Sequence, residues 1–355
     1  MNSKDAELPL PLTGIRILEP GFNLAVPLAT RFLADMGAEV IKIESPSRTE
    51  PGRTIYFPDD KLGERFWDQG GFYHETNRNK LGLSIDLTTE DGREIFRELV
   101  KTVDVVVENF TPRVMHNFGL TYEDLRQIKP DIIMLSNSGY GHTGAWSNYK
   151  AFGMTVEPTT GQSHFTGYLN GPPMRTTFAY TDSPVAMLNA FAVLTALEHR
   201  FQTGIGQWID VAMYEAGVFM LAEAMMDYGM NGRSGARMGN RDPLLAPQGA
   251  YRCAGRDSWV VLTIESNSQW NSLCDVIGKP ELAKEPCFSD VQGRIKYHND
   301  LDTIIESWTR DKDQYDVMCL LQDAGIPAGP VLTNKGLLTD PHLVQRGFLE
   351  WVHHP

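Results

Sequence analysis

The chain has 355 residues, 42% of them hydrophobic and 22% charged, which is an ordinary globular composition for two domains or one large domain. Its 45 acidic residues outnumber its 32 Lys and Arg residues, and the resulting net charge of −13, without any basic cluster, argues against nucleic acid as a partner. No run of about eighteen apolar residues is present, so no membrane span is expected.

The amino terminus and the cysteines indicate a cytoplasmic protein. Residues 1–7 lack the apolar core of a signal peptide. Cys253, Cys274, Cys287 and Cys319 match neither a CxxC metal pair nor a small disulfide framework, so we interpret them as reduced thiols. The histidines are scattered along most of the chain, and no metal site is expected.

Strand and helix signals alternate in the first half of the chain. A strand at Gly14–Leu18, a helix at Pro27–Met36 and a strand at Ala38–Glu44 predict two parallel strands joined by a right-handed crossover. Further strands are expected at Leu81–Leu87, Asp104–Glu108, Asp131–Leu135 and Trp208–Val211, and further helices after Thr88 and at Tyr122–Ile128 and Pro184–Arg200. This alternation predicts an α/β fold with an open sheet.

Open sheets of this kind bind ligands at the carboxyl ends of their strands. The corresponding segments here are Leu18–Asn23, Glu44–Ser47, Asn109–Thr111 and Asn137–Tyr140. No G-x-G-x-x-G motif follows the first strand, so a nicotinamide or flavin dinucleotide is not indicated.

The rest of the chain lacks this regular alternation. Ser138–Tyr180 is rich in Gly, Thr and Asn and is expected to form a long loop. Asn231–Ala246 is expected to be a linker, because it is rich in Gly and contains Pro. A second domain is expected to begin with a strand at Trp259–Ile264, to continue with helices near Ser268–Ile277 and Leu301–Thr309, and to end in a tight turn at Ala324–Val331.

Asp182 stands directly before the apolar run Pro184–Arg200. A helix that is apolar on nearly all sides is expected to be buried. A carboxylate at its start can cap the free amides and stay ionised beside the positive end of the helix dipole. It can equally serve as a nucleophile. The residues alone leave both interpretations open.

Several segments, in this order, resemble the class III CoA-transferases, a family that includes formyl-CoA transferase and carnitine CoA-transferase and is related to the 2-methylacyl-CoA racemases. They are Leu12–Leu18, Leu33–Pro46, Asn77–Lys80, Val107–Phe110, Thr203–Gln207 and Ala324–Val331, and the resemblance runs from about Leu12 to Leu349. It implies a Rossmann-like large domain with an open parallel sheet, a smaller α/β domain and an interlocked homodimer, with a heteromer as the alternative.

On this basis we expect a large CoA-binding domain at 1–230, a linker at 231–250, a small domain at 251–330 and a segment at 331–355 that returns toward the large domain. Acyl-CoA and a free carboxylic acid are the implied partners. Coenzyme A enters as a thioester substrate, so no tightly bound cofactor is expected.

The resemblance assigns the nucleophile to Asp182. A carboxylate that attacks a thioester carbonyl gives an aspartyl–acyl anhydride and then an aspartyl-CoA thioester, and backbone amides stabilise each oxyanion. The positions that match CoA contacts are Leu24, Ala25, Asn77, Arg78, Asn79, Lys80, Asn109, Phe110, Thr111, Lys150, Ala151 and Phe152. Among them, Arg78 and Lys80 could neutralise phosphates or belong to a solvated basic loop.

Two alternatives remain beside the transferase. One is an acyl-CoA racemase or isomerase, which needs an acid/base pair, but Gly153 stands where the racemases carry a His. The other is a non-catalytic subunit of a heteromeric transferase, against which the presence of Asp182 argues. The departure from the family pattern at Phe152-Gly153 argues against oxalate as the acceptor, and the apolar residues Leu24, Phe152 and Phe165 favour a bulky or apolar acyl group.

Overall fold

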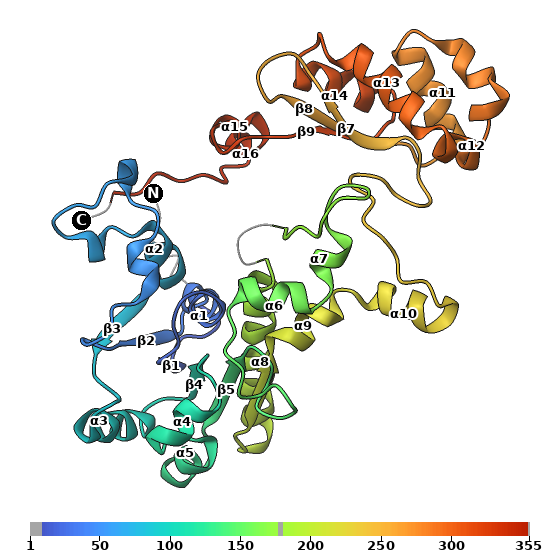
Figure 1. The fold of residues 1–355 in the computed structure, drawn as a ribbon. Coiled ribbons are helices and arrows are strands. Elements are labelled where there is room, and N and C mark those ends of the chain that lie inside the picture. Colours follow the sequence, from blue (N-terminus) through green and yellow to red (C-terminus); the bar gives the residue numbers. More distant parts are fainter. Residues whose placement is uncertain (1–8, 177–179, 354–355) are drawn as a thin grey trace. The chain divides into compact units, whose positions relative to one another are not determined.

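The computed structural model describes residues 9–176 and 180–353, which fall into two compact units (Figure 1). Unit 1 comprises the chain up to Gly167 together with Pro172–Arg237, and unit 2 comprises Tyr168–Gly171 together with the chain from Met238 onward. None of the described helices is long and apolar enough to cross a membrane.

Unit 1 is built on a six-stranded parallel sheet. The strands, in their order across the sheet, are β3 (Lys80–Ser84), β2 (Glu39–Glu44), β1 (Arg16–Glu19), β4 (Val105–Glu108), β5 (Ile133–Ser138) and β6 (Trp208–Ala212). The central strands β4 and β5 are buried along their whole length, as expected for a parallel sheet covered on both faces. The predicted α/β fold with an open parallel sheet is therefore confirmed.

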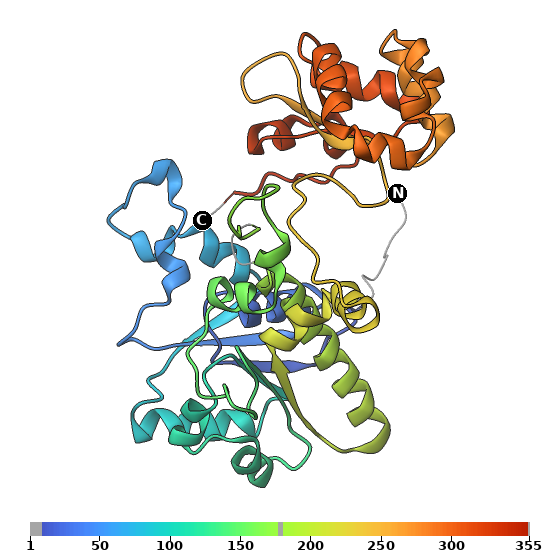
Figure 2. The ribbon, with the colours of Figure 1, turned by 45° about the vertical axis from the view of Figure 1, so that its right-hand side comes forward.

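Helices cover the two faces of this sheet (Figure 2). One hydrophobic core joins the sheet to α1 and α8, and a second joins its other face to α3, α4 and α5. The helices of unit 1 are α1 (Ala25–Asp35), α2 (Gly71–Asn77), α3 (Glu90–Val100), α4 (Arg113–Phe118), α5 (Tyr122–Ile128), α6 (Gly153–Thr159), α7 (Gln162–Phe165), α8 (Asp182–Thr203), α9 (Met213–Phe219) and α10 (Ala222–Asn231).

The expectation of a helix-free loop at Ser138–Tyr180 is wrong, because α6 and α7 lie within it. Intrinsic propensity does not favour α6, which contains Pro158 and two threonines. The helix is held by tertiary contacts instead. Val156 enters the main core, and Glu157 Oε1 accepts hydrogen bonds from the backbone N–H and the hydroxyl of Thr176, both at 3.0 Å.

Helix α8 is not buried on all sides within one chain, which corrects the expectation drawn from its apolar composition. Val185, Ala186 and Val193 lie in the main core. Met187 and Phe191 are 62% and 67% exposed. The apolar face they form in a single chain is therefore available to a partner surface.

Unit 2 contains a three-stranded antiparallel sheet in the order β7 (Gln248–Arg252), β8 (Trp259–Thr263) and β9 (Ala328–Pro330). Its helices are α11 (Asn267–Val276), α12 (Val291–Lys296), α13 (His298–Thr309), α14 (Gln314–Asp323), α15 (Asn334–Thr339) and α16 (Pro341–Gln345). The expected turn is present at the start of Ala324–Val331, and Ala328–Pro330 within the same segment forms the strand that pairs with β8. In addition, β7 begins inside the range predicted as linker, and α15 and α16 belong to unit 2.

Lys42 lies at the centre of a buried ionic network among the first three strands of unit 1. Its ammonium lies 3.1 Å from Glu19 Oε1 and 2.9 Å from Glu50 Oε2, and it donates to the carbonyl of Gly21. The other carboxylate oxygen of Glu19 accepts from Lys80 at 2.7 Å. Burial alone would raise the pKa of Glu19, but Lys80 and Lys42 bring it below its usual value. The network therefore ties β1, β2 and β3 together.

We predict that Lys42→Met lowers the free energy of unfolding by about 3–5 kcal/mol, because it leaves two buried carboxylates without their shared cation. Lys101→Met is the matched control, since Lys101 pairs with Glu98 on the exposed surface of α3 and should change the same quantity by less than about 1 kcal/mol. Urea unfolding of both variants measures the difference. Equal losses in the two variants would contradict the role assigned to the network.

Candidate active site

The crevice expected at the carboxyl edge of the sheet is present where the strand order reverses between β1 and β4. Two reciprocal hydrogen bonds join the loops that follow these strands. The backbone N–H of Phe22 donates to Asn109 Oδ1, and Asn109 Nδ2 donates to the carbonyl of Phe22, both at 2.8 Å. Asn109 thus fixes the separation of the two loops.

A small cleft of about 60 Å³ opens beside this bridge. Its lining comes from the end of β5, from the loops after β1, β4 and β5, and from the starts of α6, α8 and α9. The lining residues are Phe22, Asn23, Leu24, Asn109, Asn137, Ser138, Gly139, Ala151, Phe152, Gly153, Asp182 and Met213. Four of the residues predicted to contact coenzyme A and the predicted nucleophile therefore meet in one cleft.

Asp182 is the first residue of α8 and is only 5% exposed. The N-cap position belongs to Thr181, whose side chain caps no backbone amide among the described residues. The Asp182 carboxyl group accepts from the backbone N–H of its own residue, so the helix start and the cleft both remain roles for this side chain. Asp182 Oδ2 accepts no hydrogen bond from the described residues. A buried carboxyl oxygen without a partner lowers the stability of the fold, which indicates that this oxygen has a role other than stabilisation.

Gly153 makes this position of the carboxyl group possible. A Cβ atom on residue 153 would lie 1.7 Å from Asp182 Oδ2. Any larger side chain would therefore have to displace either the carboxyl group or the start of α6.

The environment of Asp182 raises its pKa to about 7. Burial is the main cause, the residue's own backbone N–H partly offsets it, and the negative charge of Glu157 adds to it. The expectation that the helix dipole keeps this carboxyl fully ionised is therefore not met, because desolvation outweighs the dipole. Near pH 7 the carboxyl group exists in both protonation states.

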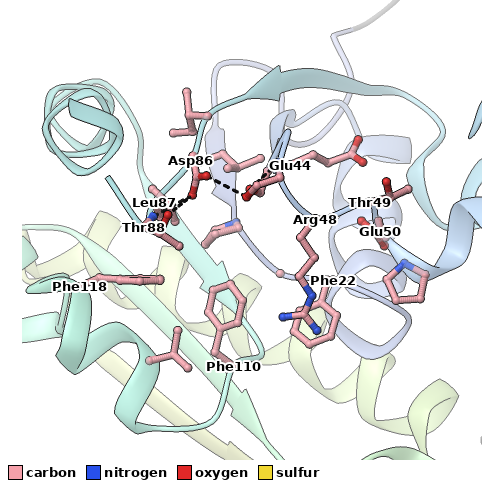
Figure 3. Close-up of a pocket in the computed structure, with 18 residues that line it drawn as sticks. Phe22, Glu44, Arg48, Thr49, Glu50, Asp86, Leu87, Thr88, Phe110 and Phe118 are labelled. Atoms are coloured by element: carbon pink, nitrogen blue, oxygen red, sulfur yellow. Dashed lines mark hydrogen bonds between the residues drawn. The ribbon is translucent and has the colours of Figure 1, made fainter. Parts of the chain in front are cut away.

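A larger cavity of about 280 Å³ lies next to the cleft, and Phe22 lines both (Figure 3). Its walls include the aromatic rings of Phe22, Phe110 and Phe118. The rings of Phe22 and Phe110 lie 5.7 Å apart, and the guanidinium of Arg48 lies 5.7 Å from the Phe22 centroid. Arg48 forms no ion pair with the described residues, so its charge is free for a ligand.

The structure does not bring Asn77, Arg78, Asn79 and Lys80 into either cavity. The ammonium of Lys80 is buried and donates to Glu19, to the carbonyl of Pro27 at 2.8 Å and to Asn77 Oδ1 at 3.0 Å. Burial lowers its pKa to about 8. All three of its N–H groups are used inside the protein, so Lys80 has none left for a phosphate.

The remaining predicted contact residues lie outside the lining of both cavities. Arg78 and Asn79 both donate to Asp35, at 2.6 and 2.8 Å. Ala25 is the first residue of α1, and Thr111 and Lys150 line neither cavity. Lys150 is exposed.

The sequence placed Asn137 and Ser138 in a segment expected to bind ligands at the carboxyl end of a strand, but it assigned neither residue a role in the site. Both side chains are buried, and Asn137 Oδ1 and Ser138 Oγ have no partner among the described residues. Three polar residues in succession, Ser136 to Ser138, at the carboxyl end of an otherwise apolar strand were the available signal. Asn137 and Ser138 add two unsatisfied polar atoms to the lining of the Asp182 cleft.

A second buried carboxyl, that of Glu108, lies outside the cleft. Burial raises its pKa to about 7, and its Oε1 lies 4.0 Å from His142 Nε2. Side chains alternate along a strand, so Glu108 lies on the same face of the sheet as Val106. Val106 and its partner Met134 on β5 belong to the core that includes α3 and α5. Among residues 9–176 and 180–353, no cluster of three His, Cys, Asp or Glu side chains is arranged to hold a metal ion.

Comparison with known proteins gives consistent matches along the whole chain. The model of CoA-transferase family III matches residues 12–355. Succinyl-CoA–D-citramalate CoA-transferase of Chloroflexus aurantiacus is 36% identical over 352 residues, which cover 98% of this chain and 85% of that protein. Succinyl-CoA:mesaconate CoA-transferase of Haloarcula hispanica is 34% identical, covering 97% of this chain and 86% of that protein.

The fold matches a solved structure as well. A CAIB/BAIF family protein from Brucella suis superposes with a TM-score of 0.86 at 31% identity and covers 96% of this chain and 89% of its own.

We predict that Asp182→Asn stabilises the protein at pH 8, by on the order of 2 kcal/mol. Because its folded-state pKa lies above the value for an unfolded chain, the wild type holds an extra proton in the folded state between about pH 4 and pH 7. Its stability therefore falls as the pH rises through this window, and the Asn variant avoids the loss.

Urea unfolding at pH 4 and pH 8 measures this effect, with the exposed Asp311→Asn as the control. The gain from Asp182→Asn should nearly vanish at pH 4. A loss of stability at pH 8 would mean that the carboxylate serves the fold.

Proposed function

The chain belongs to CoA-transferase family III, and on that premise we propose that Asp182 is the nucleophile that carries CoA from an acyl-CoA donor to a free carboxylic acid. The observation that carries this proposal is a buried carboxyl group whose Oδ2 has no hydrogen-bond partner among the described residues and which lines a cleft that adjoins a larger aromatic cavity. Its raised pKa supports the same role, because the group is not consumed by any structural ion pair.

The proposed chemistry uses a single carboxylate twice. Asp182 attacks the thioester carbonyl, the C=O electron pair moves to oxygen, and collapse of the tetrahedral oxyanion breaks the C–S bond. The departing thiolate then attacks the aspartyl carbonyl of the anhydride, which releases the donor acid and leaves an aspartyl-CoA thioester. The acceptor carboxylate repeats both steps in reverse, which frees Asp182.

We further propose that coenzyme A spans the two adjoining cavities. The aromatic walls around Phe22 and Phe110 suit the adenine ring, and the unpaired Arg48 suits a phosphate (Figure 3). Phe22 lines both cavities, so the pantetheine arm would pass this residue on its way to Asp182. Asn109, Phe110, Leu24, Ala151 and Phe152 remain the proposed contacts from sequence, and Arg48 takes the phosphate role that Lys80 cannot fill.

Dicarboxylic acids are the substrate class that we propose. The two relatives described above are named for transfers that involve succinyl-CoA and a second dicarboxylic acid. Arg175 offers a cation for the distal carboxylate, because it forms no ion pair with the described residues and contacts Met154, the neighbour of Gly153 in α6. Glu157 holds the adjacent Thr176 and thereby fixes this segment against α6.

We also propose that two chains form an interlocked homodimer. Exposed apolar side chains gather on three successive helices of unit 1, namely Met187 and Phe191 on α8, Phe219 on α9, and Met225, Met226 and Met230 on α10. Apolar surface of this kind is characteristic of obligate interfaces.

Asp182→Ala should abolish CoA exchange, because Asp182 carries the only carboxylate among the described residues that line the cleft. The test scores exchange by mass spectrometry in a panel of acyl-CoA donors and free acids, with circular dichroism as the control for folding. Wild-type exchange in this variant would sink the proposed mechanism.

The same panel run in heavy water separates transferase from racemase. Rapid α-deuterium incorporation into a 2-methylacyl-CoA, lost in Asp182→Ala, would favour the racemase instead.

Gly153→Ala should lower kcat/KM for CoA exchange by about 100-fold, because the new methyl group displaces the Asp182 carboxyl. Gly82→Ala is the control, since a Cβ atom there meets nothing within 4 Å. Steady-state kinetics of both variants provide the comparison, and full activity in Gly153→Ala would show that the carboxyl position is not critical.

Sedimentation of the wild type should show a dimer down to nanomolar concentrations, and Phe191→Glu should weaken the dimer by placing a charge in the apolar surface. A folded wild-type monomer at micromolar concentration would contradict the interlocked assembly. Ile95→Glu, an exposed substitution on α3 at the other face of the sheet, provides the control for a general effect of added charge.

A further inference from the structure

Asn137 lies near the end of β5, on the face of the sheet that α8 covers. Side chains alternate along a strand, so Asn137 shares its face with Ile133 and Leu135. Both of these residues belong to the core that contains α1 and α8. Since α8 begins at Asp182, the side chain of Asn137 lies on the same side of the sheet as the proposed nucleophile and lines the same cleft.

The hydrogen bonds of Asn137 identify which of its amide atoms is unsatisfied. Asn137 lies 3.0 Å from the carbonyl oxygen of Val211, and a carbonyl can only accept, so the atom at this position must be Nδ2. Oδ1 therefore occupies the other position. It receives no hydrogen bond from the described residues, although the residue is only 3% exposed.

This geometry restricts what can satisfy Asn137. An amide oxygen only accepts hydrogen bonds, so neither an ionised carboxylate nor a thioester carbonyl can bind it. A ligand group beside it must present an O–H or an N–H. Leaving a buried acceptor unpaired costs about 1–3 kcal/mol, and a suitable donor on a ligand would remove that cost.

We propose that Asn137 is a specificity-determining residue whose Oδ1 accepts a hydrogen bond from a donor group of the bound acyl-CoA, next to the carbonyl that Asp182 attacks. The proposal rests on the proposed function of this cleft. Two groups carry such a donor close to the thioester. One is a hydroxyl on the acyl chain, and the other is the amide N–H of the CoA arm nearest the sulfur.

The test measures binding in an Asp182→Asn background, which blocks the covalent steps. Dissociation constants for CoA, glutaryl-CoA and 2-hydroxyglutaryl-CoA are determined by calorimetry for Asn137→Leu and for Asn137→Ser, whose smaller side chain guards against a packing artefact. Asn189→Leu is the matched control, because Asn189 is also buried with both amide atoms unpartnered among the described residues but does not line the cleft.

If the donor is the acyl hydroxyl, both Asn137 variants should lose about 10- to 100-fold in affinity, and only for 2-hydroxyglutaryl-CoA. If the donor is the amide N–H of the CoA arm, the affinity for all three ligands should fall by the same factor. Affinities within about threefold of those of Asn189→Leu, for every ligand, would overturn the proposal. If the Asp182→Asn protein with Asn137 intact binds none of the three ligands, CoA binding and the proposed function both fail, and that result is distinguishable from a failure at Asn137.

Discussion

The reciprocal hydrogen bonds between Asn109 and the backbone of Phe22 are the constraint on which the site depends. In a parallel sheet, the chain leaves the two strands at the switch point in opposite directions, and the crevice between them is the natural ligand site. Left alone, two such loops could drift apart or collapse together. A single side-chain amide that binds both the N–H and the carbonyl of one residue sets their separation, and it leaves Phe22 as a wall shared by both cavities.

Asp182 differs from the buried charges that stabilise the fold, because the burial of its carboxyl group costs stability. The buried network around Lys42 uses its charges in pairs and binds three strands together. The carboxyl of Asp182 is buried without such a partner, and its pKa rises to about 7 because desolvation is not compensated. Gly153 permits this arrangement, because it has no side chain and the Asp182 carboxyl oxygen occupies the space where a Cβ atom would lie. The cleft thus brings together three polar side chains, those of Asn137, Ser138 and Asp182, that each keep an atom without a partner among the described residues.

The sequence was a good guide where a local signal determines the structure. Helix α5 occupies the predicted residues because Thr121 and Asp124 form a capping box at its start. The strands of the parallel sheet were found because each is a short apolar or alternating segment beside a helix signal. Helix α6 could not be found in this way, because it depends on the contact of Glu157 with Thr176 and on the packing of Val156, both of which are tertiary.

The same division holds for the site. The family resemblance singled out Asp182, but the isolation of its Oδ2 depends on α6, which the sequence did not predict. Lys80 lies in a recognisable motif and carries the charge expected of a phosphate ligand. Its actual partners are Glu19 and the carbonyl of Pro27, which come from β1 and α1 and are invisible in the linear pattern. The central claim, that Asp182 becomes covalently loaded, is tested most directly by incubating the protein with an acyl-CoA, adding hydroxylamine and sequencing the peptides by mass spectrometry. Conversion of Asp182 to its hydroxamate, dependent on the acyl-CoA, is the predicted result, and an unmodified Asp182 in protein that is exchanging CoA would contradict it.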